Sequence, residues 1–123
     1  MLSLGARSIL VTDVRVWTRM VEENTIFAEI EALLSERAKP GLDQLEDTLT
    51  SGYAAALALE AERWRIERRI SEVAALLGEG KRGGTKEIVK LAERLNAADA
   101  ALARLRGMLT TLRDRADAVR AAA

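Results

Sequence analysis

The chain has 123 residues, of which 49% are hydrophobic and 31% charged, a mixture typical of a folded globular protein rather than a disordered one. Its 19 basic residues balance its 19 acidic residues, so no net charge attracts nucleic acid to the molecule as a whole. There is no Cys and no His, which excludes thiol catalysis, disulfides and zinc sites of the Cys/His type.

The first helix is predicted over about residues 12–38, from an apolar stripe at helical spacing that includes Met20, Phe27, Ile30 and Leu34. Two starts are open, since Thr12 can cap a helix that begins there and Ser3 can cap a longer one. The N-terminal apolar run is too short for a signal peptide, and no stretch approaches the roughly 20 apolar residues of a membrane span. We therefore expect a soluble protein of the cytoplasm with no membrane span.

A second helix is predicted over about residues 42–77, after the break that Pro40 makes. Apolar residues recur there in a heptad, with Gly52 and Arg63 as the exceptions. Gly52 leaves two alternatives, a continuous helix or a break with Ser51 capping a new one. Glycine costs only about 1 kcal/mol inside a helix, and the heptad keeps its phase across Gly52, so we expect continuity.

GEGKRGG, residues 78–84, is the second break, and a third helix is predicted over about residues 86–121. We expect Gly78 to take the left-handed C-cap position and Thr85 to cap the next helix. The third helix continues the heptad without exception, through Ile88, Leu91, Leu95, Ala98, Leu102, Leu105, Leu109, Leu112, Ala116 and Val119.

Two long helices joined by so short a turn are expected to form an antiparallel hairpin. A register in which the numbers of facing residues add to 161 places Gly52 opposite Leu109 and Arg63 opposite Ala98. Each of the two exceptions to the heptad then faces a side chain of complementary size. The first helix, folded back across Pro40, brings Phe27 near Gly52. The sequence thus predicts an all-α, antiparallel three-helix bundle built on a long coiled-coil-like hairpin, with residues 1–123 as a single helical domain.

The glycine-rich turn is the first candidate site, because Lys81, Arg82 and Lys86 lie together there. Phosphate-binding loops also combine glycines with a lysine, but they follow a strand and place the lysine directly after the last glycine. Here Lys86 comes too late and a helix precedes. We therefore interpret the segment as a turn, with a basic tip that contacts an anionic partner as the functional alternative.

The densest charge run is ERWRIERR, residues 62–69, and it is the second candidate site. Its partner-binding candidates are Trp64, Arg65, Arg68 and Arg69, which resemble a surface that stacks on bases or binds acidic partners. Glutamates at helical spacing offer a simpler interpretation, a solvated face of ion pairs. Trp64 lies outside the heptad, so it either covers the first helix or is an exposed anchor for a partner.

Two polar residues, Arg63 and Asn24, lie on predicted inner faces, and we expect them to be buried and to fix the helix register. No carboxylates have the spacing of a di-metal site, so no metal, cofactor or catalytic residue is predicted. The segment IEALLSER, 30–37, resembles the first helix of chorismate-mutase-type enzymes. That resemblance implies an all-helical enzyme with a cationic pocket between helices.

The pattern as a whole favours a non-catalytic interaction protein such as a scaffold, an adaptor or a secretion chaperone. A small module that binds anions or nucleic acid is the alternative, and an enzyme with an Arg-lined pocket is the third hypothesis. Apolar residues outside the heptad further predict a homodimer through the second and third helices: Tyr53, Leu57, Leu76, Val89 and Met108.

Overall fold

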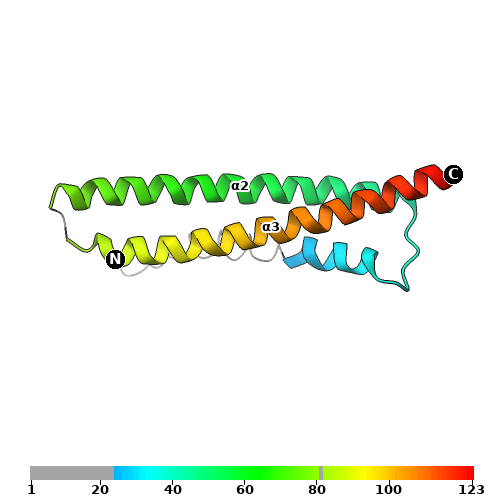
Figure 1. Cartoon of the computed structure of the whole chain (residues 1–123), viewed down its shortest axis with the longest axis horizontal. Helices are drawn as coiled ribbons and strands as arrows, with labels where there is room; N and C mark the ends of the chain where they lie inside the picture. Colours follow the sequence, from blue (N-terminus) through cyan, green and yellow to red (C-terminus); the bar gives the residue numbers. More distant parts are fainter. Residues whose placement is uncertain (1–23, 81) are drawn as a thin grey trace, which may run out of the picture.

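The computed structural model describes residues 24–80 and 82–123, which form an all-α structure. Helices α2 (Leu42–Gly78) and α3 (Gly84–Ala122) run antiparallel, side by side (Figure 1). A shorter helical segment, residues 24–34, packs on the hairpin at the end remote from the turn (Figure 1). The predicted fold class, an all-α helical bundle built on an antiparallel hairpin, is confirmed.

The helix ends lie close to the expected positions, with one exception. α2 continues through Gly52 without a break. The first helix ends at Leu34, four residues before the expected end. There the Ser35 carbonyl accepts a hydrogen bond from the Ala38 N–H at 3.0 Å, which closes a turn ahead of Pro40. Both candidate starts of the first helix lie outside the described residues.

The glycine roles at the turn differ from the prediction. Gly78 is the last residue of α2, whereas Gly80 and Gly83 have positive φ angles of 86° and 89°. Gly80 therefore does what was expected of Gly78, and its N–H donates to the Leu77 carbonyl at 3.0 Å. Gly83 is the N-cap of α3 without a side-chain cap, so Thr85 lies inside the first turn and its predicted capping role is wrong.

The predicted pairing of Gly52 with Leu109 is confirmed. A Cβ atom on Gly52 would overlap Leu109 Cδ2 and would lie 3.6 Å from Ile30 Cδ1. The first-helix atom nearest to this position belongs to Ile30, whereas Phe27 was expected there. The ring of Phe27 lies beneath Arg104, whose guanidinium carbon is 4.5 Å from the ring centroid.

Ion pairs along both edges of the hairpin show that the register holds over its length. On one edge the residue numbers of each pair add to 156, in Glu62–Arg94 and Arg69–Glu87, both at 2.8 Å. On the other edge they add to 166, in Glu60–Arg106 and in Glu46–Arg120 at 2.7 Å. The two values are symmetric about the predicted 161.

Only one edge is covered by the segment 24–34. We call this the covered edge. Ala55 has the same heptad position in α2 as Glu62, and Ala101 and Met108 have the same heptad position in α3 as Arg94. All three pack against the core. Met108, named above among the apolar residues outside the heptad that predict a homodimer, is partly buried against the core and so does not belong to an exposed surface. We call the opposite edge, with Glu46, Tyr53 and Glu60 in α2, the open edge.

The core is divided into two clusters. The larger cluster joins all three helical elements and contains Ile30, Leu45, Leu105 and Leu112, each 0% exposed. The smaller cluster, nearer the turn, contains only residues of α2 and α3: Ile66, Val73, Leu91 and Ala98. We call these regions the three-helix half and the two-helix half of the hairpin.

Candidate interaction surface

The outer face of α2 carries three exposed apolar side chains. Tyr53, Leu57 and Trp64 are 43%, 66% and 60% exposed, and we call them the α2 stripe. At about 100° of rotation per residue, the three lie within about 40° of one another and extend over ~16 Å of the helix. The outer face of a helix in a globular protein is usually polar, so the alignment of three large apolar side chains makes this face the candidate interaction surface.

A groove of about 470 Å³ lies beside the α2 stripe on the open edge. Both helices contribute to it, and its walls combine apolar and charged groups: Tyr53, Ala56, Leu57, Glu60, Arg106, Leu109, Thr110 and Arg113. The α2 stripe and this groove form one continuous surface, because Tyr53 and Leu57 belong to both.

The ion-pair series of the open edge is interrupted at the groove. Arg113 occupies the same heptad position as Arg106 and Arg120, which pair with Glu60 and Glu46. The α2 residue that corresponds to Arg113 is Tyr53. In the described part of the chain Arg113 therefore has no carboxylate partner, and the groove combines an aromatic ring with an uncompensated cation.

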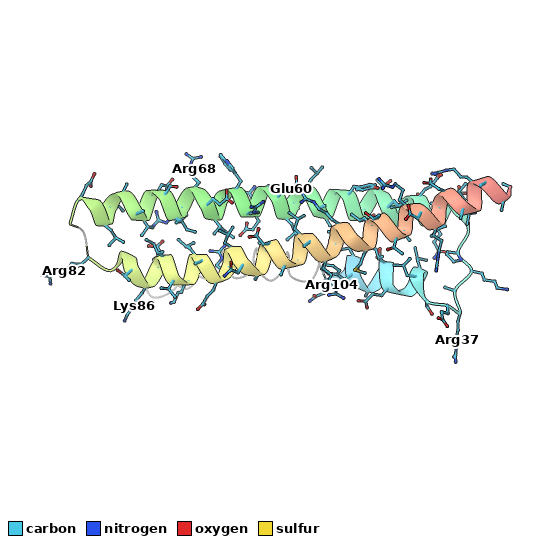
Figure 2. The ribbon with its side chains drawn as sticks, viewed as in Figure 1. Arg37, Glu60, Arg68, Arg82, Lys86 and Arg104 are labelled. Atoms are coloured by element: carbon cyan, nitrogen blue, oxygen red, sulfur yellow. The ribbon has the colours of Figure 1, made fainter. Side chains whose placement is uncertain are left out.

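Trp64 has the largest side chain of the α2 stripe. It is 60% exposed and belongs to neither core cluster, as an exposed anchor for a partner would. The Arg68 guanidinium carbon lies 5.5 Å from the indole centroid, a distance compatible with a cation–π contact. Figure 2 shows Arg68 on the outer side of α2.

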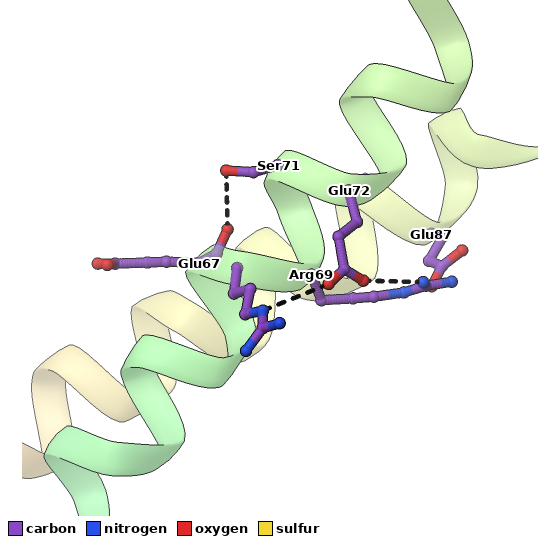
Figure 3. A network of polar contacts seen from close by, with 6 residues as sticks. Glu67, Arg69, Ser71, Glu72 and Glu87 are labelled. Carbon is purple, nitrogen blue, oxygen red and sulfur yellow. Dashed lines mark hydrogen bonds and ion pairs between the residues drawn. The ribbon is translucent and has the colours of Figure 1, made fainter.

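The other predicted arginines of the charge run form a network of ion pairs. Arg65 pairs with Glu62 at 3.6 Å and Arg68 with Glu72 at 3.5 Å. Arg69 pairs with Glu87 at 2.8 Å and with Glu72 at 3.4 Å (Figure 3).

Hydrogen bonds to Glu87 and then to Glu72 raise the pKa of Arg69 above its ordinary value, so this guanidinium remains charged. Every predicted arginine of the run is thus matched by a carboxylate of the same molecule. This favours the solvated, ion-paired face over a nucleic-acid surface.

The prediction that Arg63 and Asn24 are buried is wrong, since both are exposed. The Arg63 side chain is long enough to leave its inner heptad position for the edge of the hairpin. There it lies 2.6 Å from Asp99 and 3.5 Å from Glu67. Glu67 and Asp99 occupy facing positions of the open edge, so Arg63 bridges two like charges. Asn24 lies at the exposed beginning of the described helical segment.

The turn retains two of its predicted cations as free groups. Arg82 and Lys86 are exposed and project at the turn end of the hairpin (Figure 2). Neither takes part in an ion pair within residues 24–80 and 82–123. Lys81, the third predicted cation, lies outside the described residues.

Sequence reasoning missed the contacts that hold the first helix in place. The Arg115 guanidinium donates a hydrogen bond of 2.8 Å to the Leu33 carbonyl, which has no partner within its own helix at that end. Arg104 pairs with Glu31 and covers Phe27. The helical spacing of these arginines was visible in the sequence, but their partners depend on where the first helix ends.

No protein-family model, curated protein or solved structure matches the chain. Among the described helices, none has both the length and the apolarity to cross a membrane. The same residues hold no group of three or more metal-ligating side chains.

Proposed function

We propose that the chain is a non-catalytic interaction protein, of scaffold, adaptor or secretion-chaperone type, that acts through helix–helix contacts in the cytoplasm. The α2 stripe carries this proposal. Three large apolar side chains lie on one face of a long helix and remain exposed although the first helix covers the other edge. Such a ridge fits beside another helix, whose side chains can interlock with it.

The first partner we propose is a second copy of the chain. Burial of an exposed apolar ridge and the groove beside it stabilises an association between molecules. A twofold contact buries the ridge and the groove of both copies at once. The groove supports the same proposal, because Arg113, which has no carboxylate partner among the described residues, offers a polar anchor beside an apolar surface.

Sedimentation equilibrium at micromolar concentration tests the homodimer. We expect a mass of two chains for the wild type and of one chain for the double variant Leu57→Glu/Trp64→Glu, because charges on the α2 stripe cannot be buried there. Val89→Glu is the matched control: Val89 is 53% exposed but lies on α3 near the turn, so the dimer should persist. Circular dichroism verifies that each variant is folded. A wild-type mass of one chain at every concentration would contradict the homodimer.

The anion-binding alternative now depends on the turn, because Arg82 and Lys86 are exposed without carboxylate partners in the described part of the chain. Fluorescence anisotropy with single-stranded DNA at two salt concentrations tests it. Binding that weakens steeply with salt and is lost in Arg82→Ala/Lys86→Ala would favour this alternative. The enzyme hypothesis gains no support from Arg63, whose guanidinium is shared between two carboxylates.

A further inference from the structure

We infer that two copies associate through their α2 stripes in antiparallel orientation, with the twofold axis passing close to Leu57. The inference rests on the proposed homodimer and specifies its orientation and contacts. It follows from three features of α2: the position of the apolar side chains, the charges on either side of them, and the arrangement of the groove.

The α2 stripe is self-complementary when one copy is reversed. Its midpoint, halfway between Tyr53 and Trp64, falls between Ala58 and Leu59. An antiparallel pairing about this midpoint places Tyr53 opposite Trp64 of the second copy, and the reverse contact follows by symmetry. Leu57 then lies near the axis, with an offset along the helix of only ~4.5 Å between the two copies. Aromatic pairs of this kind add stability beyond the area that they bury.

Charge selects the antiparallel orientation over the parallel one. The part of α2 before the stripe, residues 42–50, carries three acidic side chains, Asp43, Glu46 and Asp47, and no basic one. The part at and beyond its end, residues 62–72, carries four arginines against three glutamates, so it is weakly basic even with its ion pairs inside the molecule. Reversal of one copy brings the acidic part of each α2 toward the weakly basic part of the other. A parallel pairing would instead place the two acidic parts side by side, which costs free energy.

The groove extends the contact from α2 to α3. Tyr53 and Leu57 form one wall and Thr110 and Arg113 the other, so a helix that lies on the α2 stripe also covers the mouth of the groove. The interface therefore includes both helices of each copy, which brings the buried area closer to the roughly 1,000 Å² that a stable interface needs.

Single cysteines test the orientation directly, because the native chain contains none. Leu57→Cys is expected to form a covalent dimer on mild oxidation, since the two thiols lie near the axis. Ser71→Cys lies on the same face of α2 but about two turns beyond Trp64. In the antiparallel dimer its two copies are separated by ~37 Å along the helix and should not crosslink. Val89→Cys, exposed on α3 near the turn, is the second negative control.

Each outcome separates the orientation from the homodimer. A mass of two chains, with crosslinking of Leu57→Cys alone, supports the inference. A mass of two chains in which Ser71→Cys crosslinks as well as Leu57→Cys would show parallel pairing, and a dimer without crosslinking at Leu57 would place the contact elsewhere. Either result overturns the inference and leaves the homodimer intact. A mass of one chain removes the homodimer, and the inference with it.

Discussion

The two halves of the hairpin share the same inner heptad but differ along the covered edge. In the three-helix half this edge carries Thr48, Ala55, Ala101 and Met108, which are buried or pack against the core. In the two-helix half the same heptad positions carry charged ion pairs, Glu62–Arg94 and Arg69–Glu87. The short connection through residues 35–41 keeps the segment 24–34 at this end of the hairpin, and the small and apolar residues of the covered edge let it pack closely there.

The difference also extends to burial. The three-helix half contains several side chains with no exposed surface, whereas the smaller cluster depends on Ile66, Val73, Leu91 and Ala98 and is flanked by partly buried Ile70, Ile88 and Leu95. Contact between two helices alone excludes water from only one side of each helix. We therefore expect equivalent core substitutions to have unequal effects in the two halves.

Leu105→Ala should have the largest effect, with Leu91→Ala as its matched substitution in the two-helix half. Leu105 is 0% exposed between three helical elements, so its truncation leaves a cavity that cannot collapse, and we expect a loss of about 4 kcal/mol in the free energy of unfolding. Leu91 is 5% exposed, and we expect about 2 kcal/mol. Urea denaturation followed by circular dichroism measures both, and equal losses would remove the distinction between the halves.

Gly52→Ala tests the closest approach of the three elements, with Gly107→Ala as its control. The new methyl group at Gly52 would overlap Leu109 within a packed core, and we expect a net loss of about 1 kcal/mol after the gain in helix propensity. Nothing lies within 4 Å of a Cβ at Gly107, so alanine there should raise stability by up to about 1 kcal/mol. A gain at both positions would mean that Gly52 is not needed for packing.

Arg115→Met tests how the first helix is held on the hairpin. The substitution removes the hydrogen bond to the Leu33 carbonyl, and we expect a loss of about 1 kcal/mol with faster hydrogen exchange in residues 26–34. The neighbouring Arg113→Met removes a cation without such a contact and should leave exchange in this segment unchanged. If both variants exchange alike, the Arg115 contact does not restrain the helix.

The packing of α2 against α3 could be predicted from the sequence, because a heptad and a short turn leave few registers for an antiparallel pair of helices. The register in which facing residue numbers add to 161 matched Gly52 with Leu109, and the structure brings them together. The glycine roles at the turn failed because Gly78, Gly80 and Gly83 offer the same backbone freedom. Only the observed positive φ angles distinguish them.

The candidate surface was predicted in part. Tyr53 and Leu57 were recognised as apolar residues outside the heptad, and the exposure of Trp64 was one of two alternatives. The interruption of the ion-pair series at Arg113 was missed. It could have been found in the sequence, because Tyr53 occupies the heptad position at which Glu46 and Glu60 supply a carboxylate. Arg63 was misjudged because position in a heptad describes where the Cα lies, whereas a long side chain can carry its charge to the edge.

Arg69→Met should have the smallest effect, although Arg69 contacts both Glu87 and Glu72. These groups lie in water at the edge of the two-helix half, where solvent screens the attraction and ordering of the side chains offsets it. The raised pKa of Arg69 means that its contribution is fully present below the unfolded-state pKa of arginine and is lost only at higher, strongly alkaline pH. The difference from the wild type should therefore stay within measurement error and constant between about pH 6 and 9. A clear loss in urea denaturation that disappears in high salt would show that the ion pairs, and not the narrow apolar seam, hold this half of the hairpin together.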